Sequence, residues 1–370
     1  MTTTSTALDR LVQDAEVIIS CGSGGVGKTT SAAAIALHAA SCGRQVVVVT
    51  IDPARRLADA LGLEGGLSNE PTEVALDPKP AGNGQLWAMM LDPTTTFDEL
   101  VTQYASSPER AERILVNPFY RNVAGALSGT QEYMAAEKLY QLHRDHRFDL
   151  VVVDTPPTRN ALDFLDAPAT LTRFINHRLF RLMMLPARGG MKVLNIAAQP
   201  VLRRIGKVIG GDVLADAIAF FQAFEGMEAG FRERADAVSD LLRASVTSYV
   251  LIASPRRDTV VEARYFADRL AESDLRVAAV VINRLQPRFG DVTASAAFAA
   301  ADVAGADDAD LSAMWRNLGE LCTLADAEDE VIAPLIADTD AASIHRVPLL
   351  RDDVHSLSGL REVAGHLFSN

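Results

Sequence analysis

The stretch CGSGGVGKTT, Cys21 to Thr30, has the residue types and spacing of a loop that binds phosphate. Its glycines let successive backbone amides turn toward a phosphate, its lysine adds positive charge, and its first threonine can bind Mg²⁺. A strand pattern precedes the stretch and a helix pattern follows it, which is the context that GxxxxGK[ST] requires. We therefore expect a phosphate loop whose binding residues are Gly22, Gly24, Gly25, Val26, Gly27, Lys28, Thr29 and Thr30.

Two carboxylates follow other apolar runs. Asp52 stands in TIDPARRLADAL and Asp154 stands in VVVDTPPTRNALDFL. Ligands of open α/β sheets bind at the carboxyl ends of the strands, so both side chains are expected to face the phosphates. Phosphoryl transfer to water requires a metal ion and a positioned water molecule. We expect Mg²⁺ at Thr29, Asp52 and Asp154, with Asp52 acting on the water and Lys28 on the phosphates. A turn-starting Asp-Pro is the structural alternative for Asp52.

Composition excludes several classes of protein. The chain has 370 residues, 48% of them hydrophobic, and a formal net charge of -13, which argues against a nucleic-acid-binding protein. No apolar run approaches the length of a membrane span, and the N-terminus has no secretion-signal pattern. The three cysteines, Cys21, Cys42 and Cys322, lie far apart. This usage indicates a reducing, cytoplasmic setting without a structural zinc site.

Six short apolar runs have the pattern of buried parallel strands, and helical patterns lie between them. The runs are Glu16 to Ser20, Gln45 to Ile51, Leu86 to Leu91, Asp149 to Asp154, Ser248 to Ser254 and Arg276 to Asn283. Alternation of strands and helices predicts an α/β fold with a doubly wound, mostly parallel sheet. Residues 1–170 and 246–370 are expected to form this core. Residues 171–245 are expected to form an all-helical insert, and the stretch 290–342 reads as irregular.

The insert carries an unusual charge pattern. From Ala167 to Gly211 there is no acidic residue but eight basic ones. Helical spacing puts apolar residues of 171–183 and 201–209 on one face of each segment, and a later stretch adds Phe220, Phe221, Phe224, Met227 and Phe231. These faces are either the core of a helical subdomain or a surface for an apolar client or a membrane. Both interpretations stay open.

The motifs GSGGVGKTT, TIDPARRLADAL and DTPPTRNALDFL, in this order, resemble those of the ATPases of the arsenite pump and of tail-anchored-protein targeting. VVINRL and HRVPLLRDDVHSLSGL extend the resemblance over most of the chain. It is close to the actinobacterial variant known as anion-transporting ATPases. It implies a dimeric P-loop ATPase that uses ATP and Mg²⁺. By position, Asp52 resembles the water-activating aspartate, Asp154 the aspartate near Mg²⁺, and Asn283 the adenine-reading asparagine. Pro348 then lies in the loop that covers the base.

The choice of base can also be argued from the residues. A guanine-reading NKxD motif has a carboxylate in its fourth place, and here that place is Gln286 after Asn283. Because an unpaired buried donor is costly, adenine is favoured. A cap at the end of a strand is the alternative role for Asn283.

The chain departs from the family pattern at Ser23, where the family has a signature lysine that reaches across the dimer to the other subunit's phosphates. A homodimer of this chain would lack that charge, so a heterodimer with a lysine-bearing paralogue is favoured over a homodimer. Arg159 and Asn160 also replace the usual Gly-His. The scattered cysteines make arsenite an improbable substrate, and no CxxC pair is present.

Three functions are therefore weighed. The first is an Mg²⁺-dependent ATPase that couples dimer closure to the handling of a hydrophobic client or a membrane-associated partner. The second is a nucleotide-binding regulatory subunit beside a catalytic paralogue. The third, which ranks lowest, is a partitioning ATPase similar to ParA and MinD. The expected location is the cytoplasm or the inner face of a membrane.

Overall fold

The computed structural model describes residues 6–52, 54–80, 82–121, 130–156, 163–176, 211–224, 226–305, 308–339, 341 and 343–369. The chain divides into two compact units. The first comprises Met1–Met90, Asp145–Leu162 and Ser245–Asn370, and the second comprises Leu91–Arg144 and Asp163–Ala244.

The first unit is built on one eight-stranded sheet with the order β3-β4-β2-β5-β1-β6-β7-β8. Its strands are β1 (Val17–Cys21), β2 (Gln45–Thr50), β3 (Thr72–Val74), β4 (Gln85–Met90), β5 (Leu150–Asp154), β6 (Thr247–Ala253), β7 (Val277–Leu285) and β8 (Ile344–Pro348). Every neighbouring pair is parallel except β3 and β4. This is the expected doubly wound α/β fold. Its first strand in sequence lies between β5 and β6, where the strand order reverses.

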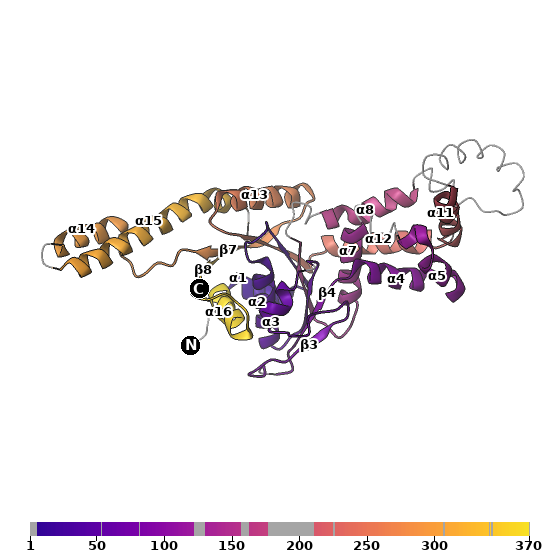
Figure 1. The fold of residues 1–370 in the computed structure, drawn as a ribbon, viewed down its shortest axis with the longest axis horizontal. Coiled ribbons are helices and arrows are strands. Elements are labelled where there is room, and N and C mark those ends of the chain that lie inside the picture. The colour runs from indigo at the N-terminus through magenta and orange to yellow at the C-terminus, as the bar shows by residue number, and fades with distance from the viewer. Residues whose placement is uncertain are drawn as a thin grey trace, which may run out of the picture. The chain divides into compact units, whose positions relative to one another are not determined.

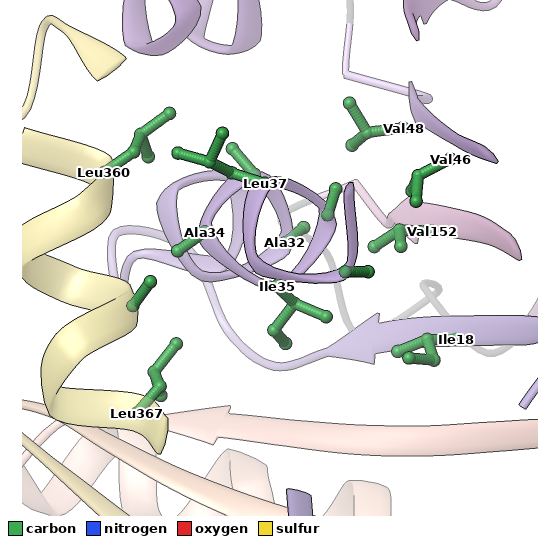
Figure 2. Close-up of a cluster of buried hydrophobic side chains, with 14 of the residues drawn as sticks. Ile18, Ala32, Ala34, Ile35, Leu37, Val46, Val48, Val152, Leu360 and Leu367 are labelled. Atoms are coloured by element: carbon green, nitrogen blue, oxygen red, sulfur yellow. The ribbon is translucent and has the colours of Figure 1, made fainter. Parts of the chain in front are cut away.

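Helices flank this sheet, except that α14 packs on α15 away from the strands (Figure 1). The helices of this unit are α1 (Ala7–Asp14), α2 (Lys28–Ser41), α3 (Arg56–Leu61), α13 (Arg257–Glu272), α14 (Ala294–Ala304), α15 (Ala309–Asp338) and α16 (Leu357–Phe368). Figure 2 shows α2 between the strands and α16, with Ile35 near Ile18 of β1 and Leu37 near Leu360 of α16. Apolar residues around its whole circumference are buried, from Ala32 to Ala40. A helix buried in this way must be apolar all round, and its alanines allow close approach to both neighbours.

The strand predictions are confirmed for all six apolar runs, and the structure adds β3 and β8. The expectation of an irregular stretch at 290–342 was wrong, because α14 and α15 fill most of it. These two helices lie side by side (Figure 1). In α15 the buried residues recur at helical spacing, from Ser312 through Gly319, Cys322 and Ala325 to Ile332. Small residues on this face give little hydrophobic signal, which is why the sequence pattern missed it.

The second unit is helical in its described part. It contains α4 (Pro93–Tyr104), α5 (Pro108–Leu115), α7 (Thr130–His143), α8 (Asp163–Asn176), α11 (Gly211–Phe224) and α12 (Glu228–Arg243). These helices share a core of their own, which includes Leu100, Tyr120 and Phe231. The boundaries of the two compact units thus differ from the expected boundaries at 170 and 245. This division assigns Leu91–Arg144, expected in the nucleotide-binding core, to the helical unit.

A buried ion pair crosses this helical core. Glu137 of α7 is fully buried and receives three hydrogen bonds from the guanidinium of Arg234 of α12, the shortest at 2.7 Å. The same guanidinium lies 4.1 Å from the ring centre of Tyr140. Removing one member of such a pair leaves an uncompensated buried charge, so the pair fixes how α7 and α12 pack.

The described part of the insert bears on its two interpretations. Phe220, Met227 and Phe231 are at most 5% exposed and pack in the core of the helical unit. These three side chains are therefore interior residues. Residues 177–210, which hold most of the basic segment and the 201–209 pattern, lie outside the described residues. Among the helices that the structure describes, none has the length and apolar character needed to cross a bilayer.

Candidate nucleotide-binding site

The predicted site residues belong to loops at the carboxyl ends of neighbouring strands. The phosphate loop joins β1 to α2, Asp154 ends β5, and Asp52 follows β2. In the sheet register, Asp154 is opposite Ser20 of β1 on one side and opposite Thr50 of β2 on the other. The parallel sheet therefore brings Asp154, Thr29 and the segment before Asp52 together, although they are far apart in sequence.

Two glycines of the loop are required by their surroundings. Gly22 has a φ of 151°, and a Cβ atom there would lie 2.2 Å from the carbonyl oxygen of Ile252 in β6. Gly27 has a φ of 91° and is the N-cap of α2, so its amide belongs to the positive end of that helix. The loop thus turns tightly beside β6 and delivers its last residues to a helix N-terminus, which favours bound anions.

The carboxylate of Asp154 is the most buried acid at these strand ends, with no solvent exposure. Its Oδ2 accepts hydrogen bonds from the hydroxyls of Thr29, at 2.8 Å, and Thr50, at 2.9 Å. Burial raises the pKa of Asp154 from its usual 3.8 to about 6, although both hydroxyls and Lys28 oppose the shift. A carboxylate in this position needs a cation nearby to be stable when it is ionised.

The second oxygen of Asp154 shows that the site fits a metal ion. Oδ1 is buried and has no hydrogen-bond partner among the residues that the structure describes. Such an atom is costly unless a ligand or water satisfies it. Together with the adjacent Thr29 hydroxyl it forms an oxygen donor set of the kind that Mg²⁺ prefers.

The ammonium group of Lys28 turns back onto its own loop. Nζ donates to the backbone carbonyl oxygen of Ser23 at 2.8 Å, and the residue is only 5% exposed. Burial lowers the pKa of Lys28, and the charge of Asp154 followed by that of Asp52 opposes this change. Both acids are thus close enough to act electrostatically on Lys28. The Ser23 carbonyl holds the ammonium group within the loop, where a phosphate oxygen could replace the carbonyl as its hydrogen-bond acceptor.

Asp52 begins the turn that leads to α3. Its Oδ1 accepts from the amide of Ala54 at 3.0 Å, and its Oδ2 lies 3.7 Å from a guanidinium nitrogen of Arg56. The first contact is the turn geometry expected of the Asp-Pro alternative. Oδ2 makes a long ion pair with an arginine that is 59% exposed. The structural role and a role toward a water molecule are therefore compatible.

Ser23 is itself buried, at 4% exposure, and its hydroxyl has no hydrogen-bond partner among the described residues. The neighbouring Cys21 is fully buried, which raises the pKa of its thiol to about 12 and keeps it neutral. Cys42 at the end of α2 and Cys322 in α15 are also free.

The two residues predicted at the base lie at the ends of adjacent strands. Asn283 is in β7, and Pro348 ends β8, where it pairs with Leu285. Asn283 is buried, and its side chain donates to the carbonyl oxygen of Val26 in the phosphate loop at 2.9 Å. Leu349 continues the pairing by donating to the carbonyl oxygen of Leu285 at 2.7 Å. Both predicted residues thus belong to the same part of the first unit as the loop.

Thr50 is the residue that the sequence analysis missed. Its hydroxyl donates to Asp154 and accepts from the amide of Asp52 at 3.2 Å, so it links the two acids. A polar residue at the carboxyl end of the apolar run QVVVVT was the available signal. Arg284 was missed as well; it donates to the carbonyl oxygen of Gly25 at 2.9 Å.

The chain is similar in sequence to a family model and to several known proteins. The family model for the anion-transporting ATPase matches residues 15–299. An ATPase GET3 from Malassezia globosa is 26% identical over 264 residues, which cover 71% of both chains. The ATPase ASNA1 homolog of Dictyostelium discoideum is 24% identical over 71% of this chain and 70% of its own. Protein Rv2184c of Mycobacterium tuberculosis is 28% identical over 73% of this chain and 59% of its own.

The raised pKa of Asp154 predicts an acid that destabilises the free protein. Asp154 loses its proton more easily in the unfolded chain than in the folded one. The protonated form therefore favours folding fully below pH 3.8, and this stabilisation is lost as the pH rises through about 6. Asp154→Asn, which keeps an acceptor oxygen for both threonines, is expected to raise the melting temperature of the protein in EDTA at pH 8. The gain should shrink as the pH falls below 6.

Thermal melts followed by circular dichroism measure this effect. The control is Asp302→Asn, because the Asp302 side chain is 77% exposed. A lower melting temperature for Asp154→Asn at pH 8, or a gain that does not depend on pH, would contradict the assignment.

Proposed function

We propose that this chain, which belongs to the anion-transporting ATPase family, is an Mg²⁺-dependent ATP hydrolase whose catalytic residues are Lys28 and Asp52. The single observation that supports this most is the buried carboxylate of Asp154. One of its oxygens is held by Thr29 and Thr50, and the other has no hydrogen-bond partner in the described part of the chain. A purely structural acid in a core would have its second oxygen satisfied. The arrangement is that of a metal site beside a phosphate loop.

The residues act as follows in this proposal. The amides of Gly22 to Thr30 and the N-terminus of α2 bind the phosphates. Lys28 exchanges the carbonyl of Ser23 for oxygens of the β- and γ-phosphates, where its charge opposes the charge that develops during transfer. Thr29 and Asp154 would hold Mg²⁺, with Asp52 close to the same shell. Bound there, the ion would neutralise negative charge on the phosphates.

Asp52 is the residue proposed to orient the attacking water. Its Oδ1 accepts from the amide of Ala54, while Oδ2 has a long ion pair with the exposed Arg56. Thr50 holds the backbone amide of Asp52 and the carboxylate of Asp154 at the same time. Thr50 therefore couples the position of Asp52, which would orient the water, to the position of Asp154, which would bind the metal. Asn283 and Pro348 are proposed to lie beside the adenine.

Two variants separate phosphate binding from hydrolysis. Lys28→Ala removes a charge that contacts phosphate, so it is expected to weaken ATP binding severely. Asp52→Asn keeps binding but removes the group that orients water, and steady-state turnover is expected to fall about 100-fold or more. Phosphate release and equilibrium titration with ATP measure the two effects.

The matched control is Asp59→Asn, an exposed acid on the adjacent helix α3. Equal turnover in wild type and Asp52→Asn would remove Asp52 from the mechanism. Unchanged ATP affinity in Lys28→Ala would contradict the phosphate-loop assignment.

We further propose that the chain works as a dimer and that Ser23 leaves each of its homodimeric sites incomplete. The family pattern places a lysine there that reaches the partner's phosphates. In this chain the side chain at position 23 is small and buried, so it offers no charge to a second subunit. The preferred assembly is a heterodimer with a lysine-bearing paralogue, which would complete the site of this chain. The regulatory-subunit alternative shares this assembly but assigns hydrolysis to the paralogue.

Restoring the charge tests this assembly. Ser23→Lys is expected to raise the turnover of the purified homodimer about tenfold or more, because a lysine at the transferred phosphate is a large electrostatic contribution. Ser23→Ala is the control and should remain as slow as wild type. In mixtures with the paralogue, Lys28→Ala in this chain should remove most of the gain. A wild-type homodimer as fast as Ser23→Lys, or a mixture insensitive to Lys28→Ala, would contradict the proposal.

The partner that ATP binding regulates is proposed to be an apolar segment or a membrane surface contacted by residues 171–245. The support is the sequence of 167–211, which has eight basic and no acidic residues. Basic amphipathic segments favour anionic lipid. Because Phe220, Met227 and Phe231 are used in the helical core, the contact is assigned to residues 177–210.

Vesicles and a peptide test this assignment. Asp52→Asn with ATP is expected to float with vesicles containing phosphatidylglycerol, or to bind a fluorescent apolar 20-residue peptide, more strongly than with ADP. Replacing residues 177–210 by a Gly-Ser linker should abolish that binding and leave ATP affinity unchanged. Absence of both interactions in either nucleotide state would rule the contact out.

A further inference from the structure

Two residues at the end of β7, Asn283 and Arg284, donate hydrogen bonds to the phosphate loop. The side-chain amide of Asn283 donates to the carbonyl oxygen of Val26 at 2.9 Å. The guanidinium of Arg284 donates to the carbonyl oxygen of Gly25, also at 2.9 Å. A third bond, from the amide of Arg284 to Oδ1 of Asn283, fixes the asparagine side chain at 2.9 Å. Two successive carbonyls of the loop are thus bound by two successive residues of one strand.

The planarity of the peptide bond gives these contacts a consequence. In a trans peptide the C=O and the following N–H point in opposite directions. The carbonyl of Gly25 shares its plane with the amide of Val26, and the carbonyl of Val26 shares its plane with the amide of Gly27. When β7 holds both carbonyls on its side, the amides of Val26 and Gly27 must point to the other side. There they add to the donors at the N-terminus of α2.

Close approach and backbone strain both mark this contact. A Cβ atom on Gly27 would lie 2.1 Å from Nδ2 of Asn283, so a side chain there would displace the asparagine. Arg284 has a φ of 64°, in the left-handed region that arginine rarely adopts. A residue in this conformation is strained and persists only where its surroundings hold it. This conformation places the amide of Arg284 on Asn283 and its guanidinium on Gly25.

We propose that Asn283 and Arg284 are positioning residues of the phosphate loop, which keep the amides of Val26 and Gly27 directed at the oxygens of a bound diphosphate. The inference rests on the proposed function, because it assumes that the loop binds phosphates. It goes beyond a role for Asn283 at the base. A residue that positions the loop acts on every diphosphate, whichever base is attached, whereas a base reader acts on one base only.

Three ligands distinguish these roles: Mg²⁺-pyrophosphate, ADP and GDP. Their affinities are measured by isothermal titration, or by competition with a fluorescent ADP where binding is weak. Asn283→Ala and Arg284→Ala are expected to weaken pyrophosphate and ADP by a similar factor, about tenfold for the loss of one such hydrogen bond to the loop. In Arg284→Ala the ratio of ADP to GDP affinity should not change, because Arg284 has no proposed contact with the base. Amide exchange in residues 22–30 of the nucleotide-free protein should become faster.

Two further arginine variants separate the contact from the strain. Arg284→Lys keeps a cationic donor and is expected to restore at least part of the affinity. Arg284→Gly relieves the strained backbone but lacks the guanidinium, so it should remain weak even though it is at least as stable as wild type. Arg316→Ala is the control, because Arg316 is an exposed residue of α15 with a single ion pair to Asp302.

The outcomes separate the inference from the function on which it rests. Unchanged pyrophosphate affinity in Asn283→Ala and Arg284→Ala, with or without a change in the ADP to GDP ratio, would overturn the positioning role. So would full affinity in Arg284→Gly. If wild type binds none of the three ligands and no ATP, the proposed function itself fails.

Discussion

The geometry of this site depends on one buried carboxylate. Asp154 has no solvent exposure, and its carboxylate accepts hydrogen bonds from the hydroxyls of Thr29 and Thr50. An acid in this environment is held in place by hydrogen bonds and is stable as an anion only when a cation approaches. The first turn of α2, the end of β2 and the end of β5 must all keep their positions for these bonds to form. The parallel register of the central strands fixes those positions.

The phosphate loop is held in a complementary way. The backbone of β6 leaves no room for a side chain at Gly22. The end of β7 donates hydrogen bonds to the carbonyls of Gly25 and Val26, and Lys28 donates one to the carbonyl of Ser23. Carbonyls are therefore occupied on the protein side, and the donor groups remain for a ligand. A cradle that is preorganised in this manner does not have to reorganise when charge develops on a phosphate. In the proposed function this loop binds the phosphates with groups of its own chain, and the serine at position 23 is proposed to change only what the loop offers to another subunit.

The sequence carried enough information for the sheet and for the loop. Buried parallel strands such as VVVVT and LVVVD are continuous apolar runs, and Gly22 and Gly27 of the loop motif leave no room for a side chain. Residues whose roles depend on cross-strand register were not predictable to the same degree. Thr50 acts because β2 lies beside β5, and Arg284 acts because its backbone adopts a left-handed conformation at the end of β7. Likewise, α15 buries a face of small residues, and the segment 91–144 joins a helical core whose partners are distant in sequence.

The central claim is that Asp154 and Thr29 hold a magnesium ion beside a bound nucleotide. The affinity of a non-hydrolysable ATP analogue, measured by isothermal titration in Mg²⁺ and in EDTA, tests it most directly. The wild-type chain is predicted to bind the analogue markedly more tightly in Mg²⁺, and Asp154→Asn is predicted to lose that difference while it still binds in EDTA. Equal affinity in Mg²⁺ and EDTA for the wild-type chain would contradict the account.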